Sequence, residues 1–249
     1  MGSDWTALAW LAALLLPLLL LKRWVSQHLQ GLGYLVTRDA QIALLLQYVV
    51  LLPGIVLHEL SHLVAATLVG VRVTGISLRP TATRGRNVRL GAVMVRPSDP
   101  LRESWIGLAP LLSGTAVILL LARWQFGISS APMLQPDTVI QELAAYLRAP
   151  DAWLWLYLIF AVSNAMLPSE SDRRPWGPVL LFLGLAAAAL YATGHLPQIP
   201  ASVREFAFTG ARYVVYAFGL TIGVDVLFGA TLFAVEKLAG KLLHRSIEY

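Results

Sequence analysis

Residues 40–69 read AQIALLLQYVVLLPGIVLHELSHLVAATLV, an apolar stretch that contains two histidines and one glutamate. A run of about eighteen or more mostly apolar residues is a candidate transmembrane helix. Ionisable side chains are costly inside a bilayer and are usually retained there for a function. This stretch therefore predicts a membrane-embedded helix that carries a functional site.

Apolar stretches recur along the chain, so we expect an α-helical integral membrane protein with about six transmembrane helices. Besides the second span at 40–69, the stretches lie at residues 5–21, 104–124, 152–167, 177–193 and 211–235. The composition agrees with this class, because only 13% of the 249 residues are charged, whereas soluble domains average about 25%.

The first span could also be a cleaved signal peptide. Signal peptides carry positive charge before the apolar run and small residues at a cleavage site after it. Here the basic pair Lys22-Arg23 follows the run, and no small-residue cleavage site precedes the pair. We therefore expect an uncleaved anchor that ends at these two residues.

The segments outside the spans predict two further elements. Residues 71–78 and 88–95 partly alternate and are rich in β-branched side chains, and residues 83–87 between them are turn-forming types. This pattern predicts a membrane-associated β-hairpin between spans two and three. Residues 135–147 gather apolar side chains on one helical face, which predicts a helix lying on the membrane surface.

The net charge of +5 does not indicate a nucleic-acid partner. The basic residues cluster in loops beside the spans, where positive charge reports topology. Lys and Arg are more numerous on the side that would hold both termini and the loops 70–103 and 168–176. We therefore expect a multi-pass protein of the cell membrane, embedded in the lipid bilayer, with both termini cytoplasmic. No oligomeric state follows from the sequence.

The second span contains the motif that carries chemistry, His58-Glu59-Leu60-Ser61-His62. Residues four apart on a helix share a face, so His58 and His62 can bind one Zn²⁺. Glu59 lies beside one ligand and can act as the base that takes a proton from metal-activated water. The chain contains no cysteine, so the remaining protein ligand must come from a side chain of another type. A satisfied polar cluster in a helix bundle is the alternative.

A zinc protease site needs a third protein ligand. Asp172 is the preferred candidate, because the span count places it at the membrane face toward which residues 40–69 run. Glu170 and Asp225 are the alternative ligands, and Asp225 could instead serve helix packing. Asn164, which precedes this segment, is a candidate for binding substrate backbone or for shaping the turn before Pro168.

These motifs resemble the site-2 protease family of intramembrane zinc metalloproteases over residues 40–185. In that family, an H-E-x-x-H helix is followed by a membrane-associated β-segment and then by an Asn-x-x-Pro motif leading to Leu-Asp-Gly. His58, Glu59 and His62 match the first motif, and Asn164 and Asp172 match the second in order and separation. The resemblance implies that Asp172 is the third zinc ligand.

The second motif departs from the family pattern at several positions. Pro168 comes one residue late, Ser171 stands in place of Leu, and Arg173 stands in place of Gly. The resemblance implies a single membrane-embedded metalloprotease domain over 1–249, with a core at 40–194 and accessory spans at 5–21 and 211–235. It also implies a zinc-dependent endopeptidase that cleaves transmembrane segments of membrane proteins.

Two other functions remain as alternatives. One is a catalytically idle zinc-binding membrane scaffold, which would not need Glu59. The other is a membrane transporter, whose intramembrane charges would line a path across the bilayer instead of clustering toward one face.

Overall fold

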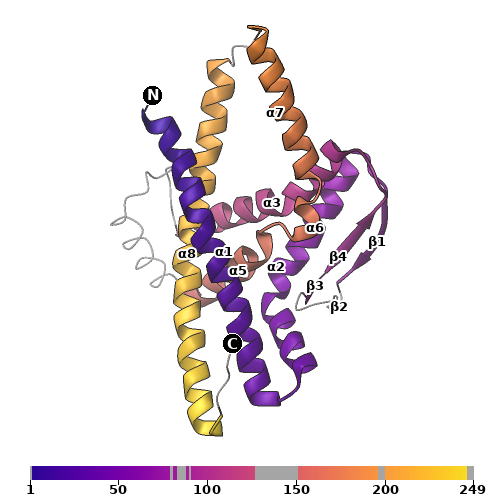
Figure 1. Cartoon of the computed structure of the whole chain (residues 1–249). Helices are drawn as coiled ribbons and strands as arrows, with labels where there is room; N and C mark the ends of the chain where they lie inside the picture. The colour runs from indigo at the N-terminus through magenta and orange to yellow at the C-terminus, as the bar shows by residue number, and fades with distance from the viewer. Residues whose placement is uncertain are drawn as a thin grey trace.

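The computed structural model describes residues 2–78, 81–82, 88–89, 91–126, 151–195 and 200–245, and most of them are helical (Figure 1). The helices are α1 (Gly2–Thr37), α2 (Ala40–Leu68), α3 (Pro100–Phe126), α5 (Ala152–Met166), α6 (Glu170–Arg173), α7 (Trp176–Ala192) and α8 (Ala201–Leu243). The strands are β1 (Val73–Ser77), β2 (Thr81–Ala82), β3 (Val88–Arg89) and β4 (Ala92–Val95). The expected interfacial helix at 135–147 lies outside the described residues.

Five helical segments in the described part of the chain are long and apolar enough to cross a membrane. They are Trp5–Thr37, Ala40–Leu68, Pro100–Trp124, Glu170–Ala192 and Ala201–Leu243. This agrees with the expected multi-pass class. The remaining expected span, at residues 152–167, corresponds to α5, which is apolar but has only 15 residues.

The first helix is longer than the sequence predicted. The basic pair Lys22-Arg23 lies within α1 and does not end it, because the residues that follow continue in helix-compatible types up to Thr37. The helix stops where Arg38 adopts a left-handed backbone, with a φ of 57°. Asp39 then caps α2 by accepting hydrogen bonds from the backbone of Gln41 and Ile42.

Helices α1 and α8 run parallel along each other (Figure 1). The contacts between them follow the same order along the two segments: Trp5 with Phe208, His28 with Glu236, and Leu35 with Arg245. The start of α1 and the end of α8 therefore lie at opposite ends of the pair. The expectation that both termini are cytoplasmic stays a prediction.

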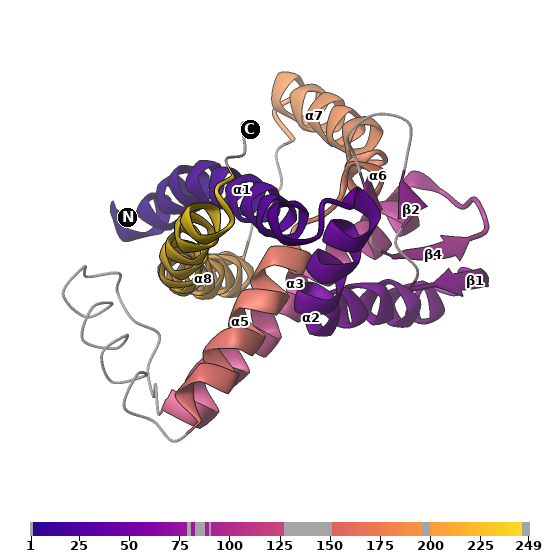
Figure 2. The ribbon, with the colours of Figure 1, turned by 90° about the horizontal axis from the view of Figure 1, so that it is seen from below.

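The main cluster of buried apolar side chains comes from α1, α2, α3, α5 and α8. Figure 2 shows α3 and α5 side by side, crossing the direction of α8. The core depends on close backbone approach, since a Cβ at Gly54 would lie 1.9 Å from the carbonyl oxygen of Ala161. Gly54 thus permits α2 and α5 to touch just before the H-E-x-x-H turn, which gives it a packing role.

The hairpin between α2 and α3 has the predicted antiparallel arrangement. Strand β1 pairs with β4 in a register that runs from Val73 opposite Val95 to Ser77 opposite Ala92. The short strands β2 and β3 pair farther along the two arms. The Tyr48 hydroxyl donates to the carbonyl of Leu78, which ties the hairpin to the side of α2.

Candidate metal centre

The two histidines of α2 face the same point, as the four-residue spacing predicted. The Nε2 atoms of His58 and His62 lie 3.2 Å apart. The Nδ1 of His58 lies 2.8 Å from the carbonyl oxygen of Ala165, and that of His62 lies 2.9 Å from the carbonyl oxygen of Ile106. Carbonyls only accept hydrogen bonds, so each Nδ1 carries the proton and each Nε2 presents a lone pair to the centre.

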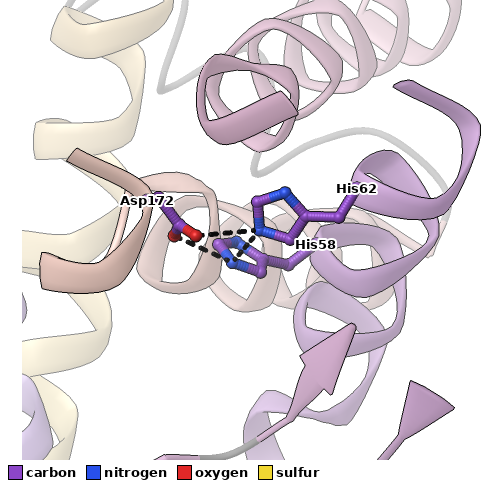
Figure 3. A group of neighbouring side chains, drawn as sticks. All are labelled: His58, His62 and Asp172. Atoms are coloured by element: carbon purple, nitrogen blue, oxygen red, sulfur yellow. Dashed lines mark hydrogen bonds and ion pairs between the residues drawn. The ribbon is translucent and has the colours of Figure 1, made fainter. Parts of the chain in front are cut away.

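Asp172 approaches the same point from α6 (Figure 3). Its Oδ1 lies 3.3 Å from Nε2 of His62, and its Oδ2 lies 3.6 Å from Nε2 of His58. Among the residues that the structure describes, the group of three or more His, Asp or Glu that could hold a metal ion consists of these three. One ligand atom from each lies within 4.8 Å of the others.

The orientation of Asp172 follows from the local sequence. Pro168 follows the end of α5, and Ser169 starts a new helical turn as the N-cap of α6. Ser169 and Asp172 form a capping box, in which the backbone N–H of Ser169 donates to Asp172 Oδ2 at 2.7 Å. This short turn holds the carboxylate toward α2, although the Leu and Gly of the family pattern are replaced by Ser171 and Arg173.

The two other candidate ligands lie elsewhere. Glu170 is exposed on α6. Asp225 on α8 is only 1% exposed, and its Oδ1 accepts hydrogen bonds from Ser163 Oγ at 3.0 Å and Asn164 Nδ2 at 2.9 Å. Neither joins the imidazoles in the metal-competent group of the described residues.

We expect Asp172→Ala to weaken zinc binding by at least about 10-fold to 100-fold, because it removes one of the three side chains that could hold a metal ion. The measurement is zinc affinity by competition with a chromophoric chelator. Glu170→Ala and Asp225→Asn are the matched controls and should both retain the metal. Loss of zinc in either control, with full binding in Asp172→Ala, would reverse the assignment.

Asn164 has a different neighbourhood from the one that its sequence position suggested. Its side chain is 5% exposed and donates to the carbonyl of Phe160 as well as to Asp225. The bond to Phe160 lies within α5, and the bond to Asp225 joins α5 to α8. The substrate-binding role of Asn164 stays a prediction, and the bonds give the residue a packing role besides.

Glu59 lies one residue from a ligand but outside the metal-competent group, as expected of a base. It is 5% exposed, and the hairpin covers it at Gly91. A Cβ at Gly91 would lie 2.6 Å from Glu59 Oε1. The carboxylate therefore lies between α2 and the hairpin, where bulk water is largely excluded.

Gly107 on α3 lets the Asp172 segment reach the imidazoles. A Cβ at this position would lie 2.2 Å from the carbonyl oxygen of Asp172. We expect Gly107→Ala to displace α6 and to lower zinc affinity by about 10-fold, as disturbance of outer-shell support does elsewhere. The control is Gly177→Ala, where a Cβ would meet no heavy atom within 4 Å. Equal zinc affinity in the two variants would contradict this role.

Comparison with protein-family models, curated proteins and solved structures finds no match to this chain. The chemistry of the centre must therefore be argued from its donor atoms. Two imidazole nitrogens and a carboxylate oxygen suit zinc, and the same donor types also serve Fe(II), whereas Mg²⁺ and Ca²⁺ prefer oxygen ligands. Both Nε2 lone pairs face the carboxylate, so the residues present fit a bound transition metal.

The sequence interpretation missed one charged group beside this centre. The Lys22 ammonium lies 3.4 Å from the carbonyl oxygen of Leu167, in the turn that leads to Asp172. A lysine inside an apolar helix is a signal, visible in the sequence, that the side chain has a defined partner. The sequence predicts the end of the first span at this basic pair, because such pairs often mark the end of a span.

Proposed function

We propose that this chain is a zinc-dependent intramembrane endopeptidase of the site-2 protease type. The observation that carries the proposal is the convergence of His58, His62 and Asp172, with Glu59 buried next to the first ligand. A structural zinc site needs four protein ligands and no neighbouring carboxylate base, whereas a hydrolytic site keeps a position open. Three ligands and an adjacent glutamate therefore favour hydrolysis over a scaffold role.

The residues of the chain have separate tasks in the proposed reaction. Bound zinc would polarise the substrate carbonyl and bring the pKa of water toward neutrality. Glu59 would accept a proton from the attacking water as its oxygen bonds to the carbonyl carbon. The same residue would return the proton to the amine nitrogen as the C–N bond breaks, leaving a carboxylic acid and an amine.

The proposed substrates are transmembrane segments of other membrane proteins. In a helix each peptide carbonyl is already hydrogen-bonded, so cleavage requires local unwinding, and helix-weakening residues near the cleaved bond should favour it. The hairpin offers backbone groups close to Glu59, through Gly91, for an unwound segment to pair with. In this proposal, both the substrate segment and the protein lie within the bilayer.

The test is a cleavage assay with the purified protein in liposomes and a model transmembrane peptide that contains helix-weakening residues. We expect cleavage that stops on addition of a zinc chelator and resumes with Zn²⁺ but not with Mg²⁺. Cleavage that resists the chelator would remove the metal from the mechanism. Stoichiometric zinc without cleavage of a panel of such peptides would favour the idle scaffold.

Elemental analysis of the purified protein separates the proposed zinc from Fe(II), which the same donors suit. Flux of ions or small solutes through liposomes containing the protein would instead favour a transporter.

A further inference from the structure

Lys22 is a positive charge in the middle of a long apolar helix. Lys22 and Arg23 are neighbours in sequence, but Lys22 is half-buried and Arg23 is exposed. A charged side chain that points into a helix bundle of a membrane protein is costly and normally has a defined partner. The surroundings of Lys22 therefore indicate what it does.

The direct partner of Lys22 lies in the turn that carries the third proposed ligand. Its Nζ lies 3.4 Å from the carbonyl oxygen of Leu167, which ends α5 as the C-cap residue. Carbonyls at a helix C-terminus have lost their intrahelical donors and need another one. Four residues separate Leu167 from Asp172, and the capping box of Ser169 makes most of that connection stiff.

The charge of Lys22 also has two carboxylates within electrostatic range. One belongs to Asp172 and the other to Asp225, while Arg173 opposes them. Asp225 is itself held by Ser163 and Asn164 of α5. The Lys22 ammonium on α1 thus lies where it attracts the turn between α5 and α6 toward α1.

We propose that Lys22 is a positioning residue for the metal centre, holding the turn from Leu167 to Asp172 at the depth of the two imidazoles. This inference rests on the proposed metal centre and adds α1 to the elements that build it. Lys22 does not ligate the metal or touch the substrate in this role. Its contribution reaches the centre through Asp172.

Two opposite effects follow from removing Lys22. Loss of the hydrogen bond releases the turn and weakens metal binding, whereas loss of a nearby positive charge relieves repulsion of a bound dication. The two are separable, because positioning acts only through Asp172 and repulsion does not depend on it. A double-mutant cycle of Lys22 and Asp172 therefore decides between them.

The experiment measures Zn²⁺ affinity of the purified full chain by competition with a chromophoric chelator. Lys22→Met should bind Zn²⁺ about 10-fold more weakly than the wild type, and Lys22→Arg should recover most of the affinity because it keeps a donor. Arg23→Met is the matched control and should not change it. In an Asp172→Ala background, Lys22→Met should cause no further loss.

Lys22→Met should still fold, since replacing a charge by Met lowers the cost of placing α1 in a membrane. X-ray absorption at the zinc edge gives a second measurement, in which saturated Lys22→Met should have one oxygen ligand fewer or a longer one. Unchanged or tighter Zn²⁺ binding in Lys22→Met would overturn the inference about Lys22 but not the metal centre. A loss of Zn²⁺ affinity from Lys22→Met that persists in the Asp172→Ala background would do the same. Wild-type Zn²⁺ affinity in both His58→Ala and Asp172→Ala would overturn the metal centre and this inference together.

Discussion

Glu59→Gln should bind zinc normally and lose turnover by about 100-fold to 10,000-fold, the range expected when a positioned general base is removed. Glutamine fills the same space beside Gly91 but cannot accept a proton from water. The measurements are zinc content and kcat on a model transmembrane peptide. This pair of results would separate the role of Glu59 from that of the ligands.

The matched control for this variant is Glu205→Gln, which changes an exposed glutamate near the start of α8. It should retain both zinc and turnover. Cleavage by Glu59→Gln at the wild-type rate would remove this residue from the mechanism. Loss of zinc from Glu59→Gln would instead make Glu59 a ligand or a support of the site.

His58→Ala and His62→Ala should each release zinc from the purified protein and abolish turnover. Each imidazole is one of the three proposed protein ligands, so we expect a loss of affinity larger than the 10-fold to 100-fold typical of outer-shell partners. The measurement is zinc stoichiometry after dialysis against a weak chelator. The imidazoles also donate through Nδ1 to two different helices, so the alanine variants lose a link between helices as well.

His195→Ala provides the control for these variants, because His195 is exposed beyond the end of α7. It should keep one zinc per chain. Stoichiometric zinc in both His58→Ala and His62→Ala would exclude the proposed centre. A thermal unfolding curve for each variant shows whether the loss of zinc accompanies a loss of folding.

The helical class and the pairing of the two histidines could be predicted from the sequence because both depend on local spacing. Apolar runs define membrane helices by length, and residues four apart share a helix face whatever the rest of the chain does. The position of Asp172 could not be predicted from local spacing alone. Its approach to the imidazoles depends on Pro168 ending one helix and Ser169 starting another. A membrane-face argument and the family resemblance together predicted Asp172 as the third ligand, and the structure groups it with the two imidazoles.

The relations between distant helices could not be predicted in the same way. Lys22 and Arg23 have the composition of a span end, and only packing against Leu167 distinguishes Lys22 from its neighbour. The parallel course of α1 and α8 also has no local signal. A count of charges in alternate loops gives the direction of each helix only if every apolar run crosses the membrane once. The contact of Gly107 with the Asp172 backbone is likewise visible only when both segments are placed in space.

The pairing of α1 with α8 has a consequence for how the protein is made. His28 and Glu236 are 208 residues apart in sequence, and their side chains lie 2.5 Å from each other. Closing so long a loop is entropically unfavourable, and it cannot begin before α8 has been synthesised. Asp225 reaches Asn164 only at the same late stage. The histidine helix is therefore present early, while the supports around it are completed last, so a nascent chain passes through most of its synthesis with the centre still unfinished.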